Sequence, residues 1–171
     1  MEFSNVIKLR YSCKKFNPEK QVSKELVEKI LEAGRMAPTA KNLQEEHIYI
    51  VRSEENLSKI DSVTPCRYGA PVVLVVAFNK DEVYTYPGGN RSSGIEDASI
   101  VATHMMLAAA DKGVDSCWIN NFNPETLHEK LNLPESEEIL MMLDLGYAAE
   151  DAEPSPNHGN RKPISEISTE I

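Results

Sequence analysis

Cysteine is scarce in this 171-residue chain, and its three thiols are not spaced as metal ligands or bridge partners. Cys13, Cys66 and Cys117 are odd in number and far apart, and no two of them form a Cys-x-x-Cys pair. Neither a disulfide framework nor a thiolate zinc site is therefore expected. Because Cys117 lies in DSCWI, which is typical of a buried strand, we favour a reduced structural thiol over a catalytic nucleophile there.

The sequence also lacks the common motifs for nucleotides and metals. No G-x-G-x-x-G follows a candidate strand, and GGNRSSG lacks the Lys-Ser/Thr ending of a phosphate loop, which excludes a separate nucleotide-binding domain. No Ser-His-Asp arrangement can be recognised from spacing. None of the four histidines has the spacing of a metal ligand, so no metal site is expected.

A signal-peptide pattern and a long membrane-spanning run are absent as well. The one long apolar helical candidate, near residues 95–110, contains Glu96, Asp97 and His104. We therefore expect a cytoplasmic protein with no membrane partner.

Basic residues are outnumbered, with 18 Lys and Arg against 27 Asp and Glu and a net charge of −9. So acidic a chain is not expected to bind nucleic acid, which requires a broad basic face. The basic residues are unevenly distributed, because residues 1–20 hold five of them and two acidic ones. A single small anion in one pocket is therefore still compatible with the sequence.

The length and the hydrophobic pattern predict one α+β domain over residues 1–171. Because several connections are too short for right-handed crossovers, we expect a mixed central sheet flanked by helices rather than a doubly wound parallel sheet. Runs rich in β-branched residues predict strands, and apolar residues at helical spacing predict helices. The expected strands are residues 47–53, 71–79, 116–120 and 138–147, and the expected helices are 4–9, 23–35 with Ser23 as N-cap, 53–60, 95–113 and 124–131.

The helix expected over residues 95–113 is apolar on nearly every side, so it should be buried on most of them. In a domain of this size, such a helix suggests a core shared by two copies, as in a homodimer. After Gly146 the chain is acidic and rich in proline. This segment cannot build a core of its own and is expected to run over the surface or over a partner.

The stretch RYSCKKF, residues 10–16, has a pattern that suits an anion. In an extended segment, Arg10, Ser12 and Lys14 project to one side, and Tyr11 and Cys13 project to the other. A guanidinium, a hydroxyl and an ammonium on one side suit a phosphate group. The alternative is that these are ordinary solvated surface charges.

Two further stretches each allow two interpretations. Arg161 and Lys162 are the only basic residues after Lys130, so Arg161 is either a solubility charge or the closing side of an anion site. MAPTAKNLQ, residues 36–44, is typical of a plain loop, although its amides also suit the polar edge of a heterocycle.

In this order and spacing, these pieces resemble the nitroreductase family of flavin mononucleotide (FMN) oxidoreductases, in its short form. The resemblance covers nearly the whole chain, through RYSCKKF, APTAKNLQ, GAPVVLVV, MMLAAADKGVDSCWI, LGY and NRKPISEI. It implies a buried central helix and an intertwined homodimer that holds FMN in two clefts between the subunits. Residues 149–171 would form a C-terminal extension that packs on the partner subunit.

The resemblance also implies a set of cofactor-binding residues. In the family, an Arg-x-Ser-x-Arg/Lys motif and a tail arginine bind the FMN phosphate, a Pro-Ser/Thr-x-x-Asn motif reaches in from the other subunit, and the strand after the buried helix passes the flavin ring. The corresponding residues here are Arg10, Tyr11, Ser12, Lys14, Pro38, Thr39, Ala40, Asn42, Ile119, Asn120, Asn121 and Arg161. Tyr11 and Lys14 stand where arginine is common in the family. The roles of Gln44, Arg91 and His104 stay open.

The activity that the resemblance implies is hydride transfer from NADH or NADPH through FMN to a quinone, a nitroaromatic or a similar small acceptor. The missing dinucleotide motif fits a ping-pong enzyme, which needs one open flavin face and no nicotinamide domain. No side chain is required as acid or base, because the cofactor carries the chemistry. One alternative is a flavin-binding or sensor module without efficient turnover. If the resemblance is set aside, the other alternative is an acidic scaffold protein with surface cations.

Overall fold

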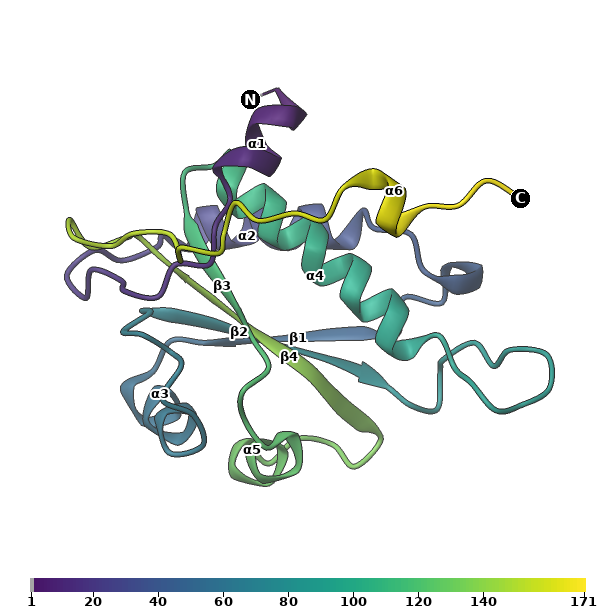
Figure 1. Cartoon of the computed structure of the whole chain (residues 1–171). Coiled ribbons are helices and arrows are strands. Elements are labelled where there is room, and N and C mark those ends of the chain that lie inside the picture. Colours follow the sequence, from purple (N-terminus) through teal and green to yellow (C-terminus); the bar gives the residue numbers. More distant parts are fainter. Residues whose placement is uncertain (1) are drawn as a thin grey trace.

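A four-stranded sheet organises the chain in the computed structural model, which describes residues 2–171. The strand order is β1-β2-β4-β3, and every neighbouring pair is antiparallel (Figure 1). The strands are β1 (Glu46–Val51), β2 (Val72–Asn79), β3 (Asp115–Ile119) and β4 (Glu137–Gly146). A parallel bridge between Ser12 and Ser116 attaches the N-terminal segment beside β3. The expected α+β class is confirmed.

The two central strands, β2 and β4, are the most apolar part of the sheet. In β2 every residue except Asn79 is buried, as expected for a strand covered on both faces. The pairing between β2 and β4 is interrupted once, because Val76 pairs with Met141 whereas Ala77 pairs with Ile139. Leu140 is therefore the extra residue of a β-bulge.

Helices flank the sheet on both faces (Figure 1). One face carries α2 (Lys24–Arg35) and α4 (Gly94–Asp111), and the other carries α3 (Glu54–Asp61) and α5 (Pro124–Leu131). Ser23 accepts a hydrogen bond from the Leu26 N–H at 3.2 Å, so the predicted N-cap of α2 is confirmed. Ser53 and Asn123 cap α3 and α5 in the same way.

The long helix α4 packs closely on α2 and on the sheet. Met105 of α4 is fully buried, and a Cβ added at Gly34 of α2 would lie 2.8 Å from its Cγ atom. The missing side chain of Gly34 thus permits the close approach of the two helices. On its other side α4 is open in a single chain, where Ile95 is 56% and Ile100 37% exposed.

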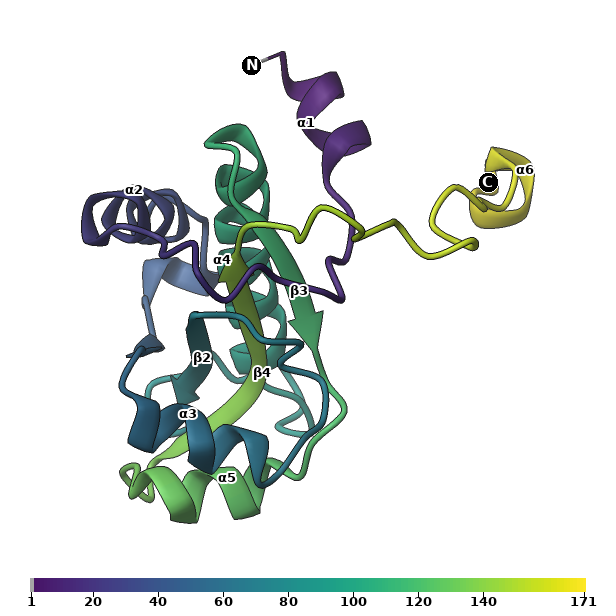
Figure 2. The same cartoon turned by 90° about the vertical axis from the view of Figure 1, so that its left-hand side faces the viewer.

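The N-terminal segment and the tail lie side by side. Phe16 and Ala148 form an antiparallel bridge, and the Asn17 N–H donates to the Tyr147 carbonyl at 2.8 Å. Beyond residue 158 the tail is exposed, and its short helix stands away from the rest of the chain (Figure 2). The short elements are α1 (Phe3–Leu9), the 3-10 turn η1 (Ala40–Asn42) and α6 (Ile164–Ile167). No helix within residues 2–171 has both the length and the apolar character needed to cross a bilayer.

Candidate functional site

The extended segment after α1 separates its side chains as its sequence predicts. The Cys13 N–H donates to the Ser116 carbonyl at 2.9 Å, which fixes the segment beside β3. Cys13 is buried and Tyr11 packs against the same part of the core, while Arg10, Ser12 and Lys14 are wholly or partly exposed. These three side chains have no hydrogen bond or ion pair with any residue of 2–171. They are therefore open to an anion from outside the chain.

The tail reaches the same end of the molecule. The Tyr11 and His158 rings meet edge to face, with their centroids 6.4 Å apart. Arg161 lies three residues further on, and its guanidinium donates to the carbonyls of His158, at 2.5 Å, and Asn160, at 2.7 Å. No carboxylate of the described chain pairs with Arg161. Arg161 is thus a further cation without a carboxylate partner, on the segment that follows the contact with Tyr11.

The residues that follow β3 are held in place by the loop between α3 and β2. The Asn121 carbonyl accepts the Thr64 hydroxyl at 2.7 Å, and its side-chain amide donates to the Cys66 sulfur at 3.4 Å. Asn120 accepts the indole N–H of Trp118 at 2.9 Å. Ile119 is buried in the core, so only its backbone can face a ligand.

Lys14 and Asn121 both affect the Cys66 thiol. Hydrogen bonds from Tyr68 and Asn121, together with the positive charge of Lys14, lower the pKa of this half-buried thiol. The Phe16 N–H donates to the Tyr68 carbonyl at 3.1 Å, so the end of the basic segment lies beside the loop that binds Asn121. Sequence reasoning missed Thr64, Cys66 and Tyr68, and no motif marks them.

The three cysteines lie in or against one hydrophobic cluster of the core although they are distant in the sequence. All three are free thiols, and Cys117 lies directly opposite Asp144 across the β3–β4 pair. Burial and the nearby Asp144 raise the pKa of Cys117 to about 12, so its thiol stays protonated and structural, as expected. Asp144 is fully buried without a hydrogen-bond partner among the described residues, and burial raises its pKa well above the usual range.

The second group of predicted residues forms a separate loop before β1. The Ala40 N–H donates to both carboxylate oxygens of Asp97, at 3.0 and 3.1 Å. The Thr39 hydroxyl accepts the Gln44 N–H at 3.1 Å, and the Gln44 side chain donates to the Asn42 carbonyl at 3.1 Å. The side chain of Gln44 therefore forms its hydrogen bond within its own loop.

One chain does not bring the two groups together. A hollow of about 330 Å³ beside Arg10 and Tyr11 is lined by Ala110, near the C-terminal end of α4, whereas Ala40 is bound to Asp97, near its N-terminal end. At about 1.5 Å per residue, the helix separates Asp97 from Ala110 by about 20 Å. Pro38, Thr39, Ala40 and Asn42 are thus remote from the basic segment of their own chain.

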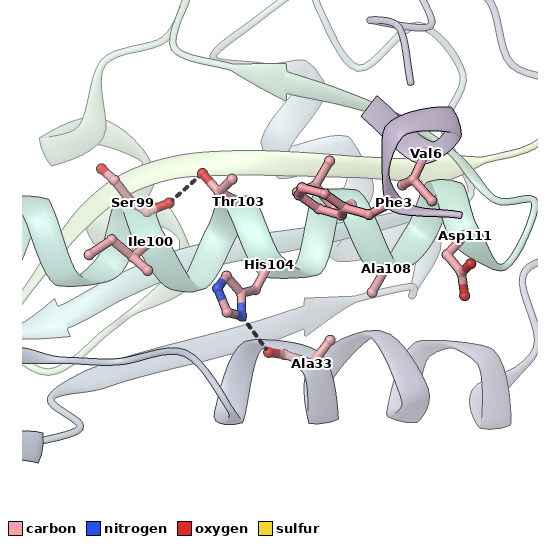
Figure 3. A pocket seen from close by; sticks show the side chains of 10 residues that line it. Phe3, Val6, Ala33, Ser99, Ile100, Thr103, His104, Ala108 and Asp111 are labelled. Atoms are coloured by element: carbon pink, nitrogen blue, oxygen red, sulfur yellow. Dashed lines mark hydrogen bonds between the residues drawn. The ribbon is translucent and has the colours of Figure 1, made fainter. Parts of the chain in front are cut away.

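A groove of about 660 Å³ follows the open side of α4 (Figure 3). Phe3 of α1 and Ile100, Leu107 and Ala108 of α4 give it an apolar lining. His104 also lines it, and its Nδ1–H donates to the Ala33 carbonyl of α2 at 3.2 Å. The structure thus places His104 in this groove and ties it to α2.

Arg91 lies outside both groups of residues. It forms an ion pair with Glu96 and lies over the Tyr86 ring, with its guanidinium carbon 4.9 Å from the ring centroid. The charge of Arg91 is thus balanced within the chain, which does not favour a role in binding an anionic substrate. Within residues 2–171, no group of three or more His, Cys, Asp or Glu side chains is arranged to hold a metal ion.

Comparison with solved structures defines the class of this fold. A nitroreductase family protein from Clostridium difficile 630 superposes with a TM-score of 0.91 at 35% identity, over 99% of this chain and 98% of the other. A Desulfovibrio desulfuricans protein, named provisionally as a nitroreductase and solved with FMN, superposes with a TM-score of 0.83 over 100% and 97% of the two chains. At 23% identity, the second likeness shows the fold alone.

Sequence comparison then identifies the family. The model of the nitroreductase family matches residues 7–64 and 65–147, and the chain belongs to this family of oxidoreductases. The Bacillus subtilis protein YodC, named provisionally as an NAD(P)H nitroreductase, is 27% identical over 96% of this chain and 96% of its own. The family that the sequence motifs resemble is confirmed.

Proposed function

We propose that this enzyme binds FMN and uses it to pass electrons from NADH or NADPH to a quinone, a nitroaromatic or a similar small acceptor. One observation carries the proposal. On a chain with a net charge of −9, Arg10, Ser12 and Lys14 share the open side of one segment and have no carboxylate partner among the described residues. The family match and the FMN-bound D. desulfuricans structure support FMN as the anion that this segment receives.

The donor set of the basic segment fits the FMN phosphate. Arg10 would supply a planar pair of N–H donors, Ser12 a hydroxyl and Lys14 a point charge. Arg161 would close the phosphate site from the tail, since His158 already lies against Tyr11. When bound, FMN supplies the ring system that takes up and releases the hydride.

The residues after β3 would face the polar edge of the ring. Asn120 and Asn121 would offer side-chain amides, and Ile119 its backbone. The hydrogen bond that Asn121 accepts from Thr64 and the one that it donates to Cys66 orient this stretch before any ligand arrives. Oriented donors of this kind stabilise negative charge at a redox centre without reorganising.

The remaining site residues would come from a second copy of the chain. Because about 20 Å of α4 separates loop 38–44 from Arg10 in one chain, we propose a homodimer in which Pro38, Thr39, Ala40 and Asn42 complete the partner's site. The open side of α4 and its groove supply apolar surface for such an interface. Residues 149–171 would pack on the partner subunit, which would cover Ile164 and Ile167 of α6, both exposed in one chain.

The proposed order of reaction is ping-pong, with the nicotinamide and the acceptor using the same open face in turn. No side chain is assigned as a general acid or base. A cytoplasmic location is part of the proposal, and the three free thiols agree with a reducing compartment.

Spectroscopy on the purified protein tests the proposal. The protein should carry FMN or take it up with a shifted visible spectrum, and anaerobic NADH or NADPH should bleach this spectrum within minutes. A quinone added next should restore it. A protein that takes up no FMN would refute the proposal. A bound flavin that keeps its oxidised spectrum with both nicotinamides would instead establish the sensor module without turnover.

A further inference from the structure

Two buried carboxyl groups adjoin the loop that carries Thr39, Ala40 and Asn42. Glu45 is 2% exposed and directly follows the loop, and Asp97 is 5% exposed in the first turns of α4. Asp97 holds the Ala40 amide with both of its oxygens. Glu45 accepts the Ser93 hydroxyl through Oε1 at 3.3 Å. Neither carboxyl group has a part in the proposed function.

The loop has a conformation that its own sequence does not favour. Three of its residues, none of them glycine, have φ angles between 53° and 57°: Lys41, Asn42 and Gln44. Apart from glycine and asparagine, residues rarely adopt this region, so the surroundings must hold Lys41 and Gln44 there. Within the described chain, the hydrogen bonds from Ala40 to Asp97 are the ones that tie residues 39–44 to another element. The loop geometry therefore depends on Asp97.

The second oxygen of Glu45 has no partner. Oε2 is buried, and no described residue donates to it. Both carboxyl groups adjoin Ser93, because its hydroxyl donates to Glu45 and its carbonyl accepts the Asp97 N–H at 2.8 Å. With both groups ionised, the Glu45 Oε2 atom would stay unsatisfied and two negative charges would share a buried site. A proton on Oε2 removes both problems, because a protonated carboxyl group can donate to the carboxylate beside it. Burial, followed by the neighbouring Asp97, raises the pKa of Glu45, in agreement with this arrangement.

The other charged groups around the pair are engaged elsewhere. The Lys41 ammonium lies over the Tyr84 ring, 4.8 Å from its centroid. Glu96 on α4 is bonded to Tyr86 and paired with Arg91. Glu46, the next residue along the chain, lines a separate hollow with Arg35 of α2. The charge that acts on Glu45 is therefore that of Asp97.

We propose that Glu45 and Asp97 share one proton, which Glu45 carries, and that this proton positions residues 39–44 for FMN binding. Loss of the proton at higher pH would set two negative charges against each other, move Asp97 away from the Ala40 amide and release the loop. Glu45 and Asp97 are thus positioning residues. The proposal rests on the proposed function only in naming FMN as the ligand.

A Glu45→Gln variant tests the role of the proton on Glu45, because it keeps the hydrogen-bond donor but cannot lose it. Its amide donates to Asp97 and accepts from Ser93 at every pH, as protonated Glu45 would. The ratio of the FMN Kd of the natural chain to that of Glu45→Gln should rise roughly threefold to tenfold from about pH 5 to about pH 9. Titration of the FMN phosphate cancels in this ratio. Glu129→Gln, which makes the same change at an exposed site on α5, should give a ratio that does not vary with pH. A constant ratio for Glu45→Gln would overturn the proposal.

Hydrogen exchange at the Ala40 amide tests the proton without FMN. In the full chain its protection factor should fall over the same pH range, and Glu129→Gln should behave likewise. Glu45→Gln should keep its protection. A protein that shows this pattern but binds no FMN would support the shared proton and refute the proposed function. Equal loss of protection in Glu45→Gln would overturn the shared proton and leave the proposed function standing.

Discussion

At the scale of single residues, the cations of the N-terminal segment differ in whether a carboxylate of the chain pairs with them. Lys15 is paired with Asp151 across a solvent-exposed contact, whereas Arg10 and Lys14 have no partner among the described residues. An exposed pair of this kind contributes little to stability. The same segment therefore has two kinds of cation. One kind is paired with a carboxylate of the tail, and the other is open to a ligand.

Removing the open cations should weaken FMN binding. We expect Arg10→Ala and Arg161→Ala each to reduce the affinity by about 1.5–3 kcal/mol, because each removes charge-assisted hydrogen bonds to the phosphate. This corresponds to a rise in Kd of roughly 10- to 150-fold, which a flavin fluorescence titration resolves. Lys15→Ala is the matched control and should change the Kd far less, since Lys15 is engaged by Asp151. Wild-type affinity in both arginine variants would refute the phosphate site.

The buried Asp144 should make stability depend on pH. Its pKa is raised in the folded state, so the stability that it contributes is fully present below its ordinary pKa and is lost as pH rises through the raised value. The free energy of unfolding of Asp144→Asn should therefore fall less from about pH 5 to about pH 8 than that of the natural chain. Urea unfolding at the two pH values measures this. Asp81→Asn, at an exposed position, should keep the natural decline, and an equal decline in Asp144→Asn would contradict the assignment.

The predicted and unpredicted residues of the site differ in the range of their contacts. The alternation of Arg10, Ser12 and Lys14 follows from the two-residue period of an extended chain, so local sequence suffices for it. The bond between Asn121 and Cys66 joins residues 55 positions apart. Nothing in either local sequence marks such a contact, which depends on how β3 and the loop after α3 pack. The shared site of Glu45 and Asp97 was missed for the same reason.

The positions where helices begin were easier to predict from the sequence than the pairing of the strands. Ser23, Ser53 and Asn123 cap helices at the positions where the sequence places their starts, because capping is a local interaction. The order β1-β2-β4-β3 and the bulge at Leu140 depend on which strands meet across the sheet. A strand sequence shows its burial but not its neighbour, so these features were not predicted.

The contact between α2 and α4 gives a prediction for a single methyl group. Gly34→Ala should lower the free energy of unfolding by about 1–3 kcal/mol, because the new Cβ would lie 2.8 Å from Met105 Cγ and 3.3 Å from Val101 Cγ1. The higher helix propensity of alanine opposes this by about 1 kcal/mol at most. Urea unfolding measures the difference. Gly159→Ala, with no atom near its added Cβ, should leave stability unchanged, and a stabilised Gly34→Ala would refute the tight contact.

For the whole molecule, the central point is that one chain holds two separated halves of the predicted site. Their separation follows from the length of α4, which the apolar run in the sequence already predicted. Which end of the helix each half would occupy was not predictable, because the bond from Ala40 to Asp97 and the bridge from Ser12 to Ser116 are tertiary contacts. The two-copy site that we propose would bring both halves to one FMN.

A charge placed in the groove along α4 should therefore abolish both the dimer and FMN binding. Ile100→Glu would bury a carboxylate in the proposed interface, where its desolvation is unfavourable. We expect light scattering to give a mass near 19.1 kDa for this variant and about twice that for the natural chain. FMN affinity should fall in parallel, because loop 38–44 of the second copy is lost from each site. Ile50→Glu makes the same change at a comparably exposed position on β1 and should remain a dimer with bound FMN. A monomeric Ile100→Glu that binds FMN as tightly as the natural chain would show that one copy suffices.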